Sequence, residues 1–158
     1  MNKVKKILFV CTGNSCRSVM AEGLLKKFLL EMGKSDIGVT SAGIRGLDGV
    51  PPTEETIDVL KAEGVVMDDF RSRSVTTEMI IDAGLILVME DLHNDEVLRR
   101  VPEASGKTFL LKEFGVSPIA KNHEKGIGIP DPIGRPVEFY RYVLNQIKKE
   151  AERIAKIL

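Results

Sequence analysis

Two residue types suited to chemistry on a phosphate, a cysteine and an arginine, lie close together near the N-terminus, at Cys11 and Arg17. The apolar run before them predicts a strand and the amphipathic stretch after them predicts a helix, so residues 11–18 join a strand to a helix. Backbone N–H groups of such a loop, and of the helix that follows, point at one spot and favour an anion. The same donors and the Arg17 cation hold a cysteine as thiolate, its nucleophilic form. The pattern predicts attack by Cys11 on a phosphate whose oxygens Arg17 binds as a fork.

The residues between and after this pair suit a loop that wraps a phosphate. Gly13 allows the backbone to approach closely, and Asn14 tolerates the left-handed conformation that a tight curl requires. Ser18 is placed to donate a hydrogen bond to the Cys11 sulfur, which stabilises it as thiolate and later as leaving group. We expect the loop to bind a phosphate or sulfate anion, through Thr12, Gly13, Asn14, Ser15, Cys16 and Ser18.

This segment resembles the signature of the low-molecular-weight protein tyrosine phosphatases, a Cys-x-x-x-x-x-Arg-Ser loop after the first strand, usually with Gly-Asn inside it and a second cysteine before the arginine. Further matches follow in the family's order over almost the whole chain: Met20-Ala21-Glu22, Ser41-Ala42-Gly43, Pro51-Pro52, Arg73 and Asp131-Pro132. The resemblance implies a metal-free phosphatase without a cofactor, which hydrolyses phosphotyrosine in phosphorylated proteins, and small aryl phosphates, through a phosphocysteine. It also suggests that Ser41 and Arg73 brace the loop from outside.

A general acid is needed as well, because the expelled oxygen must receive a proton. Asp131 is the candidate: Pro132 stiffens its backbone, and Pro130 and Gly134 mark an irregular loop. The resemblance places the family's general acid at the same position. The competing interpretation of Asp131-Pro132 is an ordinary turn before a helix.

The chain departs from the family around the substrate pocket. Members that act on phosphotyrosine usually have tyrosines just after Asp-Pro, where this chain has Ile133 and Gly134. Another pocket aromatic is replaced by Leu47 or its neighbours Ile44 and Arg45. Phe70 replaces a histidine often found three residues before Arg73. Ser15 stands where a bulky aliphatic residue is usual, and a small polar residue there resembles the bacterial protein-arginine phosphatases. Hydrolysis of phosphoarginine, with Asp131 pairing with a guanidinium, is therefore the alternative function.

The second cysteine and the two histidines are the other reactive groups. Cys16 either packs in the core or forms a reversible disulfide with Cys11 that protects the nucleophile from over-oxidation. His93 and His123 lie in polar stretches without metal-ligand spacing, which predicts solvated surface positions and no metal site. We expect a solvated face for the lysines at Lys107, Lys112, Lys121 and Lys125.

Three other function classes fit less well. A thiol-relay arsenate reductase needs two more cysteines after Cys16, and none follow. A sugar-transport phosphocarrier also presents a cysteine after its first strand, but Arg17 and Asp131 favour turnover over carriage. A nucleotide-binding module lacks support because the loop has no Walker lysine.

The hydrophobic pattern predicts the elements that position these residues. Strands are expected at 7–10, 37–42, 85–89 and 107–110, and helices at 19–32, 53–64, 76–82, 92–100 and from 136 to the end, with loops at 43–52 and 117–130. Because strand and helix alternate, we expect an α/β fold with a central four-stranded parallel sheet and helices on both faces. Residues 117–130 are predicted to cover the active face, and the Cys11 loop to lie at the carboxyl ends of the strands.

Composition limits the remaining properties. A length of 158 residues fits one domain over 1–158. The 23 basic and 23 acidic residues balance, which argues against nucleic-acid and membrane-surface partners. Two cysteines are too few for a disulfide framework, and a free thiolate suits the reducing cytoplasm. We expect a cytoplasmic monomer whose partner is a phosphorylated protein substrate.

Overall fold

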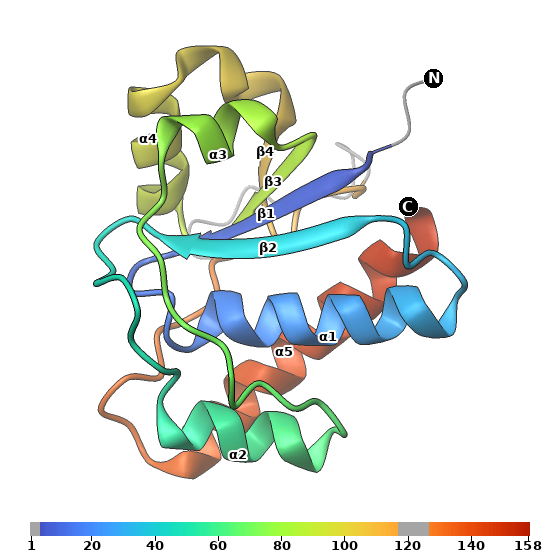
Figure 1. Cartoon of the computed structure of the whole chain (residues 1–158), viewed down its shortest axis with the longest axis vertical. Coiled ribbons are helices and arrows are strands. Elements are labelled where there is room, and N and C mark those ends of the chain that lie inside the picture. The colour runs from blue at the N-terminus through green and yellow to red at the C-terminus, as the bar shows by residue number, and fades with distance from the viewer. Residues whose placement is uncertain (1–3, 117–126) are drawn as a thin grey trace.

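A computed structural model describes residues 4–116 and 127–158 of the chain. Its sheet has four parallel strands in the order β2-β1-β3-β4, with bounds Lys6–Cys11 for β1, Gly38–Gly43 for β2, Leu85–Val88 for β3 and Thr108–Leu110 for β4. The helices are α1 at Arg17–Glu31, α2 at Glu54–Ala62, α3 at Thr77–Asp82, α4 at Asp91–Arg100 and α5 at Val137–Ile157 (Figure 1). The predicted α/β fold with a four-stranded parallel sheet is confirmed.

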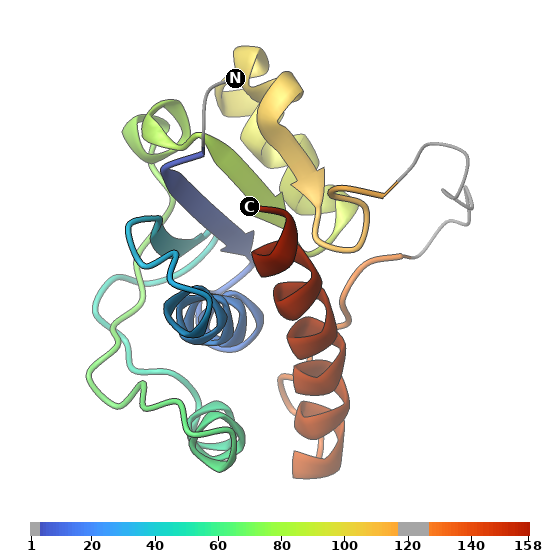
Figure 2. The ribbon, with the colours of Figure 1, turned by 90° about the vertical axis from the view of Figure 1, so that its right-hand side faces the viewer.

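The helices lie in layers on the two faces of the sheet. α1 and α5 pack side by side against one face, and α2 packs on them from outside (Figure 2). α3 and α4 cover the other face. Alternation along β1 feeds both cores, because Ile7 and Phe9 point to the α1 and α5 side while Leu8 and Val10 point to the other.

The element boundaries follow from local chemistry. Thr53 and Thr76 cap α2 and α3 by accepting backbone N–H groups with their hydroxyls. Pro102 ends α4 and opens a short 3-10 helix at Pro102–Lys107, which the hydrophobic pattern did not predict. α1 begins at Arg17, two residues before the predicted start. Arg17 and Ser18 of the loop at 11–18 therefore belong to the first turn of this helix.

The prediction of a solvated surface position for Lys107 was wrong, and other surface predictions lie outside the described residues. Lys107 is half-buried and donates hydrogen bonds to the carbonyls of Ile81 and Ala83, so it satisfies the end of α3 rather than facing water. His123, Lys121 and Lys125, and most of the predicted loop over the active face, fall within residues 117–126, outside the described chain.

Candidate active site

The loop of residues 11–18 lies at the carboxyl end of β1. β1 lies between β2 and β3 in the sheet, so the order of the strands reverses at this point. This is where open α/β sheets place their ligands. The first turn of α1 holds Arg17 and Ser18 and no acidic residue, and Cys16 at its N-cap provides no side-chain cap within the described part of the chain. Its N–H groups are therefore left for an anion.

Asn14 fixes the curl of the loop. Its φ is 54°, the left-handed conformation expected from the sequence, and its side chain is fully buried. Its Oδ1 accepts the backbone N–H of Arg73 at 3.0 Å, which assigns the amide orientation and leaves Nδ2 to donate to Ser18 Oγ at 2.8 Å and to Ser41 Oγ at 3.0 Å. Arg73 Nε also donates to the carbonyl of Ser41 at 3.1 Å. Ser41 and Arg73 thus hold the loop from outside, as the resemblance suggested.

Cys11 is buried, with 3% of its surface exposed, and its Sγ lies 2.9 Å from Ser18 Oγ. Since Ser18 Oγ already accepts a hydrogen from Asn14, its own hydrogen is available to the sulfur. The expected contact between Ser18 and the Cys11 sulfur is therefore present. Gly13, Ser15 and Thr12 complete the turn between this sulfur and α1.

Arg17 is almost completely buried, at 2% exposed, and it contacts the loop and two other segments of the chain, at Glu90 and Ile129. Its Nη1 donates to Glu90 Oε2 at 2.6 Å and to the carbonyl of Ile129 at 2.7 Å. Its Nη2 lies 3.4 Å from Thr12 Oγ1. Sequence reasoning missed Glu90, although its place after the buried run of β3 puts it at the same edge of the sheet as Cys11.

Asp131 joins the site through Arg17. Its Oδ2 lies 3.8 Å from Arg17 Nη2, and its side chain remains 44% exposed. Its Oδ1 accepts the backbone N–H of Ile133 at 3.1 Å, so the ordinary turn that competed with the general-acid interpretation is also present. The two roles use different oxygens, and the structure brings Cys11, Arg17 and Asp131 to one end of the sheet.

Cys16 makes side-chain contacts with residues of α5 and of the segment before α2. It is free, as is Cys11, and its Sγ lies 3.5 Å from Thr53 Oγ1 and 3.9 Å from Tyr140 Oη. Burial raises the pKa of Tyr140 to about 12, so the phenol stays protonated beside the sulfur at neutral pH. In this structure the Cys16 side chain is packed in the core cluster, and the reversible disulfide with Cys11 stays a prediction.

The prediction for His93 was wrong, because this side chain is fully buried instead of solvated. It belongs to the first turn of α4, and its Nδ1 accepts the backbone N–H of Glu90 at 3.0 Å. Its Nε2 lies 2.9 Å from Thr12 Oγ1, in the loop that holds Cys11. The polar neighbours of His93 in the sequence are on the exposed side of α4. A prediction based on these neighbours therefore places His93 on the surface, although its side chain points inward.

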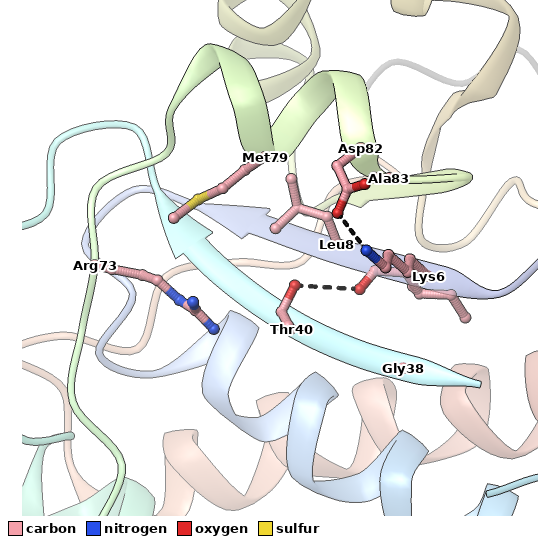
Figure 3. Close-up of a pocket in the computed structure, with 9 residues that line it drawn as sticks. Lys6, Leu8, Gly38, Thr40, Arg73, Met79, Asp82 and Ala83 are labelled. Carbon is pink, nitrogen blue, oxygen red and sulfur yellow. Dashed lines mark hydrogen bonds and ion pairs between the residues drawn. The ribbon is translucent and has the colours of Figure 1, made fainter. Parts of the chain in front are cut away.

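The candidate site is separate from a pocket of about 260 Å³ on the α3 side of the sheet. Lys6 and Asp82 pair across this pocket at 2.7 Å, and Arg73 and Met79 flank its other end (Figure 3). Its lining, taken from the described residues, contains neither Cys11 nor Asp131. In the described ranges no group of three or more potential metal ligands lies together, and no helix is long and apolar enough to cross a membrane.

Comparisons with known proteins agree on one family. The family model described as low molecular weight phosphotyrosine protein phosphatase matches residues 6–158. A protein-arginine-phosphatase of Geobacillus stearothermophilus is 37% identical over 153 residues, covering 97% of this chain and 95% of that protein. The tyrosine phosphatase Wzb from Escherichia coli K30, solved in complex with sulphate, has a TM-score of 0.84 at 30% identity and covers 98% of this chain and 99% of its own.

A further solved structure carries chemical information. It is a mutant of the YwlE arginine phosphatase with a phosphorylated active site serine, with a TM-score of 0.86, 27% identity, and coverage of 97% of this chain and 95% of that one. The similar proteins thus include phosphatases named for tyrosine and for arginine.

Proposed function

Because this chain belongs to the low molecular weight phosphotyrosine protein phosphatase family, we propose that it hydrolyses phosphotyrosine in proteins, and small aryl phosphates, through a phosphocysteine on Cys11. The chain is a phosphoric monoester hydrolase of this class. The observation that carries the assignment of residues is the convergence of three groups: the buried Cys11 sulfur beside Ser18, the buried Arg17 guanidinium, and Asp131 at 3.8 Å from Arg17.

The first step forms a sulfur–phosphorus bond. The loop amides and Arg17 hold the phosphate oxygens while the Cys11 thiolate attacks phosphorus in line with the phenolic oxygen. The phosphorus–oxygen bond breaks, and Asp131, in its acid form, transfers its proton to the departing oxygen. Tyrosine leaves as a neutral phenol, and the phosphoryl group stays on the sulfur.

The second step returns the enzyme to its starting state. The Asp131 carboxylate takes a proton from water as the water oxygen attacks phosphorus. The sulfur–phosphorus bond breaks, inorganic phosphate is released, and the thiolate is regenerated beside Ser18. A similar protein with a phosphorylated active site serine supports a phosphoryl group on the loop nucleophile.

Phosphoarginine is the second candidate substrate, and a specific observation favours it. Ser15 is half-buried and offers a small polar side chain where bulky aliphatic residues are usual, and a similar protein is named a protein-arginine-phosphatase. The positions that the resemblance assigns to pocket aromatics also hold exposed aliphatic residues here, Leu47 at 76% and Ile133 at 54% exposed, and neither stacks as an aromatic ring does.

The experiment that tests both compares rates on matched peptides carrying phosphotyrosine, phosphoserine or phosphoarginine, for the wild-type protein, for Ser15→Ile, and for Cys11→Ala as the inactive control. A preference of kcat/KM for phosphotyrosine supports the main proposal. A preference for phosphoarginine that Ser15→Ile removes supports the alternative, and turnover by Cys11→Ala contradicts both.

Regulation and setting complete the proposal. Peroxide converts the Cys11 thiolate to a sulfenic acid, and attack by the Cys16 thiol releases water and forms a disulfide that thiols later reduce. We expect peroxide inactivation to become irreversible in Cys16→Ser; full recovery with dithiothreitol contradicts this role. A cytoplasmic, monomeric protein fits the thiolate chemistry and the balanced charge.

A further inference from the structure

The Arg17 guanidinium is held from outside the phosphate-binding loop. Its Nη1 donates to two acceptors, Glu90 Oε2 at 2.6 Å and the carbonyl of Ile129 at 2.7 Å. These two bonds occupy one corner of the planar group. They leave the opposite edge, formed by Nε and Nη2, as the pair of parallel donors that matches two oxygens of a phosphate.

His93 links Glu90 to the loop on the other side. The backbone N–H of Glu90 donates to Nδ1 of His93, so Nδ1 has no hydrogen and Nε2 carries it. Nε2 therefore donates to Thr12 Oγ1 at 2.9 Å, and Thr12 Oγ1 lies 3.4 Å from Arg17 Nη2. Arg17, Glu90, His93 and Thr12 form a closed ring of hydrogen bonds from the start of α4 to the phosphate-binding loop.

The backbone that leads to Asp131, the proposed general acid, is hydrogen-bonded to this ring through Arg17. Ile129, whose carbonyl accepts from Arg17, lies two residues before Asp131, and its own N–H donates to the carbonyl of Met89 at 2.8 Å. Gly128 packs closely here, since a Cβ on it would lie 3.1 Å from Glu90 Cγ and 3.1 Å from the Met89 carbonyl. Glu90 thus contacts Arg17 and also the segment that leads to Asp131.

We propose that Glu90 and His93 are positioning residues, which orient the Arg17 guanidinium so that its Nε–Nη2 edge faces the phosphate; this inference rests on the proposed phosphatase function. A carboxylate beside a site for a dianion repels the substrate, so Glu90 does not favour phosphate binding by direct contact. Its contribution is to hold the Arg17 guanidinium in the orientation that binds phosphate. A guanidinium tethered at Nη1 loses little freedom when phosphate binds, and a small misplacement of such a group lowers rates steeply.

The test measures kcat, KM and inhibition by orthovanadate, which mimics the five-coordinate phosphorus of the reaction. The variants are Glu90→Ala, which removes the tether, Glu90→Gln, which keeps an acceptor for Nη1, and His93→Asn, which keeps an acceptor for the Glu90 N–H but does not reach Thr12. Val97→Ala is the matched control, because Val97 is fully buried on the same helix and belongs to the core cluster on the other face of the sheet.

We expect Glu90→Ala to lower kcat/KM and to weaken vanadate inhibition by about tenfold to 10²-fold, with Glu90→Gln recovering part of both. His93→Asn should shift both in the same direction, and Val97→Ala should lower the melting temperature while vanadate inhibition stays at the wild-type value. Unchanged vanadate inhibition in the folded Glu90 and His93 variants overturns the inference.

If Glu90→Ala does not fold, vanadate inhibition of Glu90→Gln and His93→Asn decides whether Glu90 and His93 position Arg17. Failure of the underlying function is a different result, because in that case the wild-type protein itself shows no turnover that depends on Cys11. A wild type that turns over, with positioning variants indistinguishable from it, contradicts only the inference drawn here.

Discussion

Asp131 uses its two carboxylate oxygens for different purposes. Oδ1 accepts the backbone N–H of Ile133 and fixes the turn, while Oδ2 faces Arg17 at 3.8 Å. An asparagine can keep the first contact through its carbonyl oxygen, but it has no acidic proton to transfer. Substitution at this position therefore separates the turn from the proton transfer.

We expect Asp131→Asn to lower turnover by about 10²–10⁴-fold on phosphotyrosine peptide, whose phenol leaves poorly without a proton. On p-nitrophenyl phosphate, whose leaving group is a stable anion, the loss in the first step should be much smaller. A series of aryl phosphates with graded leaving groups, assayed by single-turnover phenol release, measures this. An equal loss across the series would contradict a role in protonating the leaving group.

His93 makes the stability of the fold depend on pH. Burial, and then the Arg17 cation, lower the pKa of His93 from 6.5 to about 3. Below pH 6.5 the unfolded chain binds a proton at His93 that the folded protein refuses, so stability falls as the pH falls through this window and is fully present above it.

The wild-type protein should therefore lose up to about 1.4 kcal/mol of unfolding free energy per pH unit below pH 6.5 through this one group. His93→Asn lacks the titrating group and should show a shallower slope. Urea unfolding of both proteins at about pH 7 and about pH 5 measures the difference. Parallel pH dependence in the two proteins would contradict a buried neutral His93.

At the level of elements, the end of β2 shapes the phosphate-binding loop. β2 runs beside β1 to the last residue of both, pairing Gly43 with Cys11. Ile44 and Arg45 then continue alongside the loop, donating backbone N–H groups to the carbonyls of Cys11 at 3.0 Å and Thr12 at 2.9 Å. This close approach requires a residue without a side chain at Gly43.

A Cβ at Gly43 would lie 2.6 Å from the carbonyl oxygen of Thr12 and 2.9 Å from the backbone nitrogen of Asn14, so Gly43→Ala must move the loop. We expect kcat/KM to fall by about tenfold or more, because the amides that bind phosphate shift with it. Gly38→Ala is the control on the same strand, where the nearest atom to the new Cβ is 3.6 Å away. Equal activities of the two variants would contradict the account.

The strength of each local signal decides which elements the sequence predicts. Fully apolar runs such as Ile7 to Val10 and Leu85 to Val88 have only one place in an α/β domain, at the centre of the sheet, and these were predicted to within a residue. The Cys11 loop was predicted because its chemistry is local. Glu90 and His93 escaped because their partners, Arg17 and Thr12, are far away in the sequence and only tertiary packing joins them.

At the level of the whole molecule, two hydrophobic cores lie on opposite faces of the sheet and serve different purposes. The larger one joins α1 and α5 to the sheet and contains Cys11 and Cys16, so the loop that carries the chemistry is anchored in it. The smaller one supports α4, which brings Glu90 and His93 to the same loop from the other side. The site therefore depends on both faces of the sheet, and α5 contributes to it through the burial of the larger core.

A substitution at Ile147 on α5 tests whether this part of the larger core contributes to stability and not to catalysis. It is fully buried and two turns beyond Tyr140, the residue of α5 that contacts Cys16. We expect Ile147→Ala to lower the unfolding free energy by about 2–5 kcal/mol, through lost burial and the cavity left behind, with kcat near the wild-type value. Leu30→Ala, at a side chain that is 68% exposed, should cost far less. A large fall in kcat at a temperature where Ile147→Ala is folded would contradict a contribution to stability alone.

If the phosphoryl group passes through the Cys11 sulfur, a phosphorylated intermediate can be trapped on that residue. The wild-type protein is mixed with an aryl phosphate, quenched in acid during turnover, digested and analysed by mass spectrometry. We expect one phosphoryl group on the peptide that contains Cys11, and none in Cys11→Ala. A phosphoryl group on another residue, or hydrolysis that persists in Cys11→Ala, would contradict passage of the phosphoryl group through the Cys11 sulfur.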